Sequence, residues 1–269
     1  MVHQGRRRLM GLVWLASYPK SGNTWLRFML YAYIFGPPAA SIEVAQRIPD
    51  LHRTVPGQLP PSEPELMKTH FMLSDRHPRL QETTGAIHIM RNPRDVALSA
   101  LNYRKLTGEG ARAFTESGYL KGFIKAGGDI DWLRLGFGNW AQHARSWRTT
   151  DRFPVLALRY EDLKNDPAAG LRSMIEFLKL DLDEDKLAQA VKASSFDAMR
   201  AMEIREKAKP TKDAHNKRLF VGDTKAARKG VYFVNKGASG QSLASVSPKL
   251  DEAFTHAFAD AMQEFGYEP

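Results

Sequence analysis

A short apolar run, a tight polar loop and a second apolar stretch follow one another between Leu12 and Tyr33. Leu12–Ala16 has the length of a strand, and the apolar residues from Trp25 onward continue far enough for a buried helix. A strand, a loop and a helix in this order bring several free backbone N–H groups and the positive end of a helix dipole to one point. The stretch therefore predicts an anion site, for which phosphate is the usual ligand.

The loop itself reads Ser-Tyr-Pro-Lys-Ser-Gly-Asn-Thr, and its residue types suit an anion. Lys20 supplies a mobile positive charge, and Gly22 lets the backbone approach a ligand closely. Ser21 and Thr24 supply hydroxyl donors. The alternative interpretation is a turn with a helix cap and no ligand. The Walker A loop does not fit, because Lys20 precedes Gly22 and no glycine stands five positions upstream.

The composition describes a folded domain. The chain has 269 residues, 43% of them apolar and 26% charged, which predicts a single domain over residues 1–269. The absence of cysteine excludes disulfides, thiol catalysis and zinc–thiolate sites. Arg6-Arg7-Arg8 and the apolar run after it are similar to the start of a signal peptide, but the run leads straight into the polar loop. No stretch approaches the ~20 apolar residues of a membrane span, so we expect a cytoplasmic protein without a membrane partner.

Positive charge is concentrated in one segment. The net charge is +9, and between Arg200 and Lys236 eleven Lys or Arg stand against four Asp or Glu. One interpretation is a surface that binds nucleic acid or another polyanion. The other is a loop that closes over a small, multiply charged anion. Because the segment lacks a sustained helical period, we expect a basic, lid-like loop over about 200–236.

Four apolar runs of strand length, 12–16, 66–70, 86–90 and 155–160, alternate with helical patterns. These patterns predict helices after Trp25, over 42–47, from Pro93, over 135–147, from Pro167, near 187–191 and from Pro248, with a mobile, glycine-rich flap over about 107–131. The alternation predicts an α/β fold with a mostly parallel central sheet and helices on both faces. Ligands of such sheets bind beyond the carboxyl ends of the strands. The Lys20 loop, Lys68-Thr69-His70, Arg91 and Arg159-Tyr160 would meet there.

Six segments together resemble the cytosolic-type sulfotransferases, in order and in spacing. The segments are Ser17–Trp25, Lys68-Thr69-His70, Arg91–Ser99, Tyr160–Leu163, Ser195–Met199 and Arg228-Lys229-Gly230. They are similar, in that order, to the family's 5′-phosphosulfate loop, catalytic lysine–threonine–histidine, 3′-phosphate motif, Tyr-Glu-Asp segment, adenine contact and the Arg-Lys-Gly that grips the 3′-phosphate. The chain departs from the family at Asn23, where threonine is usual. It also has Gly240-Gln241-Ser242 in place of the usual Gly-x-Trp.

The resemblance implies a three-layer fold similar to the P-loop NTPases. It also implies transfer of a sulfuryl group from 3′-phosphoadenosine 5′-phosphosulfate (PAPS) to a hydroxyl or amine. Such a transfer is expected to pass through a loose, in-line transition state and in principle requires no metal ion. By the resemblance, His70 is the general base, Lys20 meets the departing 5′-phosphate and Lys68 assists at the sulfuryl oxygens. The other implied contacts to the donor are Ser21, Gly22, Asn23, Thr24, Trp25, Arg91, Ser99, Tyr160, Ser195, Phe196, Met199, Arg228, Lys229 and Gly230.

Several alternatives stay open from the residues alone. Lys68 could be a solvated surface lysine, and Arg91 could pair with Asp95 at a helix start. A P-loop-like kinase would need Mg²⁺ and would ignore a 3′-phosphate. A non-enzymatic binder of polyanions would use the basic segment over 200–236. For the enzyme, the expected partner is a small, largely apolar alcohol, phenol or amine and not a nucleic acid, because aromatic residues are frequent over 33–71 and 107–137.

Overall fold

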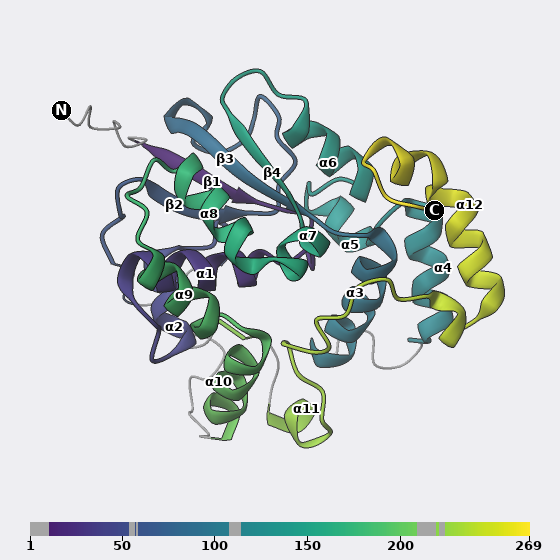
Figure 1. Ribbon diagram of the computed structural model, residues 1–269. Helices are drawn as coiled ribbons and strands as arrows, with labels where there is room; N and C mark the ends of the chain where they lie inside the picture. The colour runs from purple at the N-terminus through teal and green to yellow at the C-terminus, as the bar shows by residue number, and fades with distance from the viewer. Residues whose placement is uncertain (1–10, 54–56, 58, 108–113, 209–218, 221–223) are drawn as a thin grey trace.

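The computed structural model describes residues 11–53, 57, 59–107, 114–208, 219–220 and 224–269 (Figure 1). Its centre is a sheet of four parallel strands in the order β2-β1-β3-β4. The strands are β1 (Leu12–Ala16), β2 (Glu65–Thr69), β3 (Thr83–Met90) and β4 (Val155–Arg159). The sequence-based prediction of a parallel sheet is confirmed. All strands end at the same edge, because parallel strands joined by crossovers run in one direction.

The inner strand β1 is buried on both faces, which explains its unbroken apolar sequence. Val13 and Leu15 belong to the hydrophobic cluster on one face of the sheet. Leu12, Trp14 and Ala16 belong to the cluster on the other face. Alternate side chains of a strand point to opposite faces, so both helical layers depend on this single strand.

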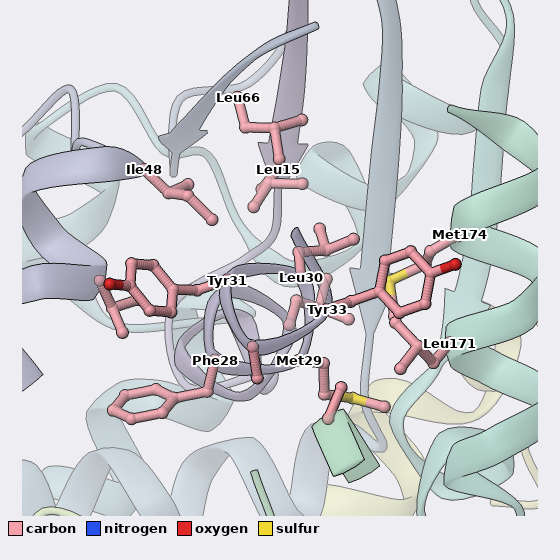
Figure 2. Packing of buried hydrophobic residues seen from close by; sticks show 14 of the residues in the cluster. Leu15, Phe28, Met29, Leu30, Tyr31, Tyr33, Ile48, Leu66, Leu171 and Met174 are labelled. Atoms are coloured by element: carbon pink, nitrogen blue, oxygen red, sulfur yellow. The ribbon is translucent and has the colours of Figure 1, made fainter. Parts of the chain in front are cut away.

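One helical layer is built around the helix that follows the polar loop. Its helices are α1 (Asn23–Phe35), α2 (Ser41–Arg47), α7 (Tyr160–Asn165), α8 (Pro167–Phe177) and α9 (Glu184–Ala193). Figure 2 shows α1 end on, with Leu15 and Leu66 of the sheet on one side and Leu171 and Met174 of α8 on another. Because α1 is surrounded, most of its residues are apolar and buried.

The second layer covers the opposite face and extends to the far side of the molecule. Its helices are α3 (Pro93–Thr107), α4 (Glu116–Ala126), α5 (Ile130–Arg134), α6 (Trp140–Arg148) and α12 (Pro248–Glu264), with short 3₁₀ turns at Leu80–Glu82 and Leu243–Ser245. Trp147 of α6 packs in the cluster that contains Trp14 of β1. Figure 1 shows α12 beside α4, and Phe258 of α12 stacks on Phe123 of α4 at 6.1 Å between ring centroids.

The helix starts expected at Pro93 and Pro167 are confirmed. Asn92 accepts a hydrogen bond from the backbone N–H of Arg94 (2.9 Å) just before α3 begins at Pro93. Asp166 caps α8 in the same way through the N–H of Ala169 (2.9 Å). A side chain that satisfies a free N–H ahead of a proline is the expected start of a helix.

The mobile flap expected over 107–131 is wrong for the part that the structure describes. Residues 116–126 form α4, whose Leu120 and Phe123 are buried and whose first turn is capped by Thr115. The glycines there lie within a helix held by tertiary packing, which overrides their low propensity. Residues 108–113 lie outside the described residues. The helix expected over 135–147 begins at Trp140, where Asn139 and Gln142 form a capping box.

The basic, lid-like loop expected over 200–236 is also wrong in part. Residues 196–208 form α10 (Phe196–Ala208), and a five-residue helix, α11 (Thr224–Arg228), follows. The amphipathic signal of α10 is weak because its buried face carries the ion pair Glu203–Lys207, 2.5 Å apart and almost fully buried. Residues 209–218 and 221–223 of this segment lie outside the described residues. No helix among those that the structure does describe has the length and the apolar character needed to cross a bilayer.

A pair of buried histidines lies between the sheet and α6. The rings of His88 on β3 and His143 on α6 stack with 5.5 Å between their centroids. Burial lowers the pKa of His88 to about 3, with Arg148 adding to the shift, and burial lowers the pKa of His143 well below its ordinary value. Both rings are therefore neutral in the folded protein at neutral pH.

This pair predicts that acid destabilises the fold. In the unfolded chain His88 binds a proton below about pH 6.5, whereas in the folded protein it stays neutral down to about pH 3. Stability contributed above pH 6.5 is therefore lost as the pH falls, by about 2 kcal/mol for His88 at pH 5. Urea unfolding at pH 7 and pH 5 measures this loss. We expect a His88→Phe variant to lose less stability between the two pH values, and an equal loss in both proteins would contradict the prediction.

Candidate active site

A cleft of about 1400 Å³ opens at the carboxyl ends of the four strands. Each strand end contributes to its lining, as expected for this class of sheet. Of the residues expected at the site, the following line the cleft: Lys20, Gly22, Asn23, Thr24, Trp25, Lys68, His70, Arg91, Ser99, Tyr160, Ser195, Phe196, Met199 and Gly230. Ser21 is fully buried beside it. Arg228 and Lys229 are exposed and are not among the lining residues.

The loop between β1 and α1 adopts two left-handed backbone conformations. Lys20 has φ 71° and Gly22 has φ 106°. A Cβ atom on Gly22 would lie 2.8 Å from the ring of Tyr160, so both the backbone conformation and the space require glycine there. The hydroxyl of Ser21 is buried and has no hydrogen-bond partner among the residues that the structure describes. The loop thus ends at the N-terminus of α1 with unsatisfied donors, which suits an anion.

Asn23 has a structural part within this loop. Its side-chain N–H groups donate to the carbonyl of Leu15 (2.8 Å) and to the hydroxyl of Ser17 (3.1 Å). The residue that departs from the family's usual threonine therefore ties the start of α1 back to the end of β1. Its Oδ1 is buried, and no described residue donates a hydrogen bond to it.

The ammonium of Lys20 lies against two aromatic rings. It is 4.1 Å from the ring centroid of Phe233 and 4.9 Å from that of Tyr103. Burial lowers the pKa of Lys20 to about 7, and the positive charges of Lys68 and Arg91 lower it further, against the opposing charge of Glu203. A group that is desolvated among like charges gains from a bound anion, which would raise its pKa.

His70 is held in one tautomer. Its Nδ1 lies 2.7 Å from the backbone carbonyl of Ser17, and a carbonyl can only accept, so Nδ1 carries the proton. Its Nε2 is then an acceptor and makes no hydrogen bond to any residue that the structure describes. Burial, and then the charge of Lys68, lower the pKa of His70 well below its ordinary value. The ring is neutral at pH 7, which is the state that a general base requires.

Lys68 is not a solvated surface lysine. Its ammonium lies 2.5 Å from a carboxylate oxygen of Asp50, and the two side chains are 13% and 11% exposed. The backbone N–H of His70 donates to Nε2 of His52 (2.8 Å), and the two imidazoles stack at 5.6 Å. Asp50 and His52 were not expected at the site, because they lie in a proline-rich stretch without periodicity or a motif.

The donor side of the cleft is closed by residues 230–242, which we call the strap. Arg91 lies 4.3 Å above the ring of Tyr160 and donates to the carbonyls of Lys20 (3.3 Å) and Ala238. Asp95 is fully buried, and its carboxylate accepts from strap residues 240 and 241. The alternative pairing of Arg91 with Asp95 is therefore not what the structure contains.

The cleft-lining part of the strap lies beyond the Arg-Lys-Gly motif. Gly230 lines the cleft, and so do Asn235, Lys236, Gly237 and Ala238. The hydroxyl of Tyr160 donates to the carbonyl of Gly237 (3.3 Å). The positive charge that the structure brings into the cleft from the strap is Lys236, eight residues after Arg228. The motif in the sequence could not show that Lys236, and not Arg228, lines the cleft.

The adenine contacts expected from the sequence gather at the same end. The ring of Trp25 meets that of Tyr160 edge to face at 5.6 Å. Phe196 is 38% exposed and lines the cleft with Ser195 and Met199. Partly exposed aromatic side chains of this kind provide faces on which a planar base can stack. Within the described residues, no group of three or more metal-ligating side chains is arranged to hold a metal ion.

Comparison with known proteins assigns the class. The sulfotransferase domain family matches residues 11–266, so the chain belongs to the sulfotransferase family. Mouse sulfotransferase 1A1 is 30% identical over 200 residues, which are 70% of this chain and 66% of the relative. Human sulfotransferase 2B1 is 26% identical over 258 residues, 93% of this chain and 66% of the relative. The matched part thus spans about two thirds of the length of these relatives.

Solved structures share the fold. Retinol dehydratase in complex with androsterone and the inactive cofactor PAP superposes with a TM-score of 0.66 at 17% identity, over 93% of this chain and 80% of that protein. Mouse sulfotransferase SULT7A1 complexed with PAP gives a TM-score of 0.62 at 22% identity, over 94% and 84%. The α/β sulfotransferase fold expected from the sequence is confirmed, as is the family.

The state of Lys20 leads to a prediction on proton uptake. With a pKa of about 7, free Lys20 is mostly neutral at pH 8. An anion bound at the loop raises this pKa, so binding should take up as much as about one proton. Calorimetry with PAP at pH 8, in buffers of different ionisation enthalpy, measures the number. We expect the uptake to disappear in Lys20→Met, and equal uptake by both proteins would assign the proton to another group.

Proposed function

We propose that this chain transfers a sulfuryl group from PAPS to a hydroxyl group of a small organic acceptor. The observation that carries the proposal is the placement of two groups in one cleft. One is an anion-binding loop with a desolvated lysine, and the other is a neutral histidine whose Nε2 is open. Membership of the sulfotransferase family and the PAP found in related structures support the same donor.

The proposed reaction follows from these positions. The acceptor oxygen attacks the sulfur of PAPS, and its proton passes to Nε2 of His70. The bond between sulfur and the bridging oxygen of the 5′-phosphate breaks, and PAP leaves. Lys20 stabilises the negative charge that develops on that oxygen, together with Thr24 and the N–H groups of the loop. Lys68 lies on the acceptor side and would meet the sulfuryl oxygens.

For the 3′-phosphate of the donor we propose Arg91, Ser99 and Lys236. Arg91 and Ser99 were expected from the sequence, and both line the cleft. Lys236 takes the place that the sequence assigned to Arg228, because Lys236 lines the cleft and Arg228 does not. Trp25, Tyr160 and Phe196 are proposed to hold the adenine.

For the acceptor we propose a small, largely apolar alcohol or phenol. The cleft beyond His70 is lined by Trp132, Leu135 and Phe137, and the ring of Phe137 lies 5.7 Å from that of His70. Such a wall favours a flat, apolar body with one polar group directed to the base. A cytoplasmic location also stays a proposal. The kinase and the polyanion binder are less well supported, since neither needs an open histidine beside the anion loop.

The donor site is tested by nucleotide binding without metal. We expect PAP to bind more tightly than ADP or 5′-AMP, because only PAP carries the 3′-phosphate. In calorimetry the Lys236→Ala variant should lose ~10-fold or more of its affinity for PAP, as expected for a charge-assisted contact. Its affinity for 5′-AMP should stay unchanged.

Arg228→Ala is the matched control, since it removes an equal charge from a residue that does not line the cleft. A loss of PAP affinity in Arg228→Ala but not in Lys236→Ala would assign the 3′-phosphate contact to Arg228, as the Arg-Lys-Gly motif indicated. Equal binding of all three nucleotides, or binding that needs Mg²⁺, would contradict the proposed donor.

His70 is tested by turnover. The His70→Ala variant should lose ~10²–10⁴-fold in kcat, the range that general-base catalysis contributes, while its affinity for PAP stays within about twofold of the parent's. Transfer of sulfuryl from PAPS to a simple phenol such as 4-nitrophenol provides the assay. Turnover equal to that of the parent enzyme would remove His70 from the mechanism.

A further inference from the structure

Residues 49–52 run beside the end of β2 as a short parallel extension of the sheet. The N–H of Lys68 donates to the carbonyl of Pro49 (2.8 Å), and the N–H of Leu51 donates to the carbonyl of Lys68 (3.0 Å). Residues 51 and 52 then form a turn, which the N–H of Arg53 closes by donating to the carbonyl of Asp50 (3.0 Å). Asp50 and His52 both line the cleft, whereas Leu51 packs against the buried cluster on the sheet.

Asp50 holds the ammonium of Lys68. One carboxylate oxygen lies 2.5 Å from that ammonium, and the other accepts the backbone N–H of His52 (3.0 Å). Burial alone would raise the pKa of Asp50, but the charges of Lys68 and Arg27 hold it well below its usual range. Asp50 is therefore a carboxylate that fixes the direction of one cation and also the segment that carries His52.

His52 holds the main chain of His70. Its Nε2 accepts the N–H of His70 (2.8 Å), so the neutral ring carries its proton on Nδ1. The two imidazoles stack 5.6 Å apart with an interplanar angle of 13°. Together with the carbonyl of Ser17 at Nδ1, this contact fixes the ring of His70 at two points.

We propose that Asp50 and His52 are a positioning pair, in which Asp50 directs Lys68 and His52 directs His70 toward the reacting atoms. The inference rests on the proposed sulfuryl transfer, and neither residue corresponds to one of the segments that resemble the family. The end of β2 supplies the two groups proposed to act, and the turn beside it supplies the two groups proposed to position them. A displacement of about 1 Å in a reacting group can cost on the order of 10²-fold in rate.

Two substitutions at His52 separate the effect of its hydrogen bond to His70 from the effect of its ring. His52→Gln keeps an acceptor for the N–H of His70, and His52→Phe keeps a ring but leaves that N–H without its partner. With 4-nitrophenol and PAPS we expect His52→Phe to lose ~10–10²-fold in kcat at an unchanged KM for PAPS. His52→Gln should keep most of the activity. His256→Gln, on the exposed side of α12, is the control for loss of a histidine.

A double-mutant cycle tests Asp50. If Asp50 acts through Lys68, then Asp50→Asn should lower kcat in the parent chain and should have little further effect once Lys68 is Met, because coupled residues are not additive. PAP affinity and the thermal midpoint of each variant show whether the chain is folded. Equal losses in both backgrounds, or full activity of His52→Phe, would overturn the positioning pair.

A measurement without substrate keeps the inference separate from the proposed function. Long-range ¹H–¹⁵N spectra report which nitrogen of each imidazole carries the proton. We expect the Nδ1–H form for His70 and His52 in the parent protein, and a changed His70 signal in His52→Phe but not in His52→Gln. The Nε2–H form of His52 would overturn the pair even in an active enzyme. Failure of the parent enzyme to bind PAP, with these signals as expected, would instead contradict the proposed function.

Discussion

The carbonyl and hydroxyl groups of Ser17 connect the two halves of the site. Ser17 is fully buried directly after β1, and its N–H donates to the carbonyl of Thr69 at the end of β2 (3.3 Å). Its own carbonyl fixes Nδ1 of His70, and its hydroxyl accepts from Asn23. The pairing of β1 with β2 is thus continued beyond the strand ends by the contacts of Ser17 with Thr69 and His70. For this reason the anion loop and the candidate base have a fixed relation even without a ligand, and little ordering remains to be done on binding.

The cleft gathers more positive charge than its own carboxylates compensate. Burial lowers the pKa values of both Lys20 and Lys68. The charges of Lys68 and Arg91 lower the pKa of Lys20 further, and those of Arg27 and Arg53 lower the pKa of Lys68 further. Asp50 offsets Lys68, while Glu203 lies buried with Lys207 and acts on Lys20 only at a distance. The fold holds these cations close together in a partly desolvated site, where they repel one another. A bound anion offsets that repulsion, so the site has a higher affinity for anions. Burial, and then the charge of Lys68, keep His70 neutral.

The fold and the main cleft residues could be predicted from the sequence because they depend on local signals. Leu12–Ala16, the loop up to Thr24 and the cap-then-proline start at Asn92 each define their own conformation within a few residues. The polar partners could not be predicted in this way. Asp50 reaches Lys68 and His52 reaches His70 across 18 residues of chain, in a stretch with no period. Likewise α4 owes its helix to packing against α12, since its glycines and its composition favour a loop.

The attachments of the strap decide which part of it can adjust to a nucleotide. One end is held at Glu203, whose carboxylate accepts the N–H groups of Phe233 (2.7 Å) and Val234 (2.8 Å), and the other end is held at Asp95. Both carboxylates are fully buried, so breaking either contact would leave buried carboxylate oxygens without these donors. The stretch between them, 235–238, is held to the cleft by single bonds from Arg91 and Tyr160 to carbonyls. Those two donors are also the side chains nearest a 3′-phosphoadenosine in the proposed function. A nucleotide would therefore exchange carbonyl acceptors for phosphate at this stretch while both buried anchors remain in place. The ring of Phe233, one residue inside the first anchor, stays close enough to Lys20 to keep water from its ammonium.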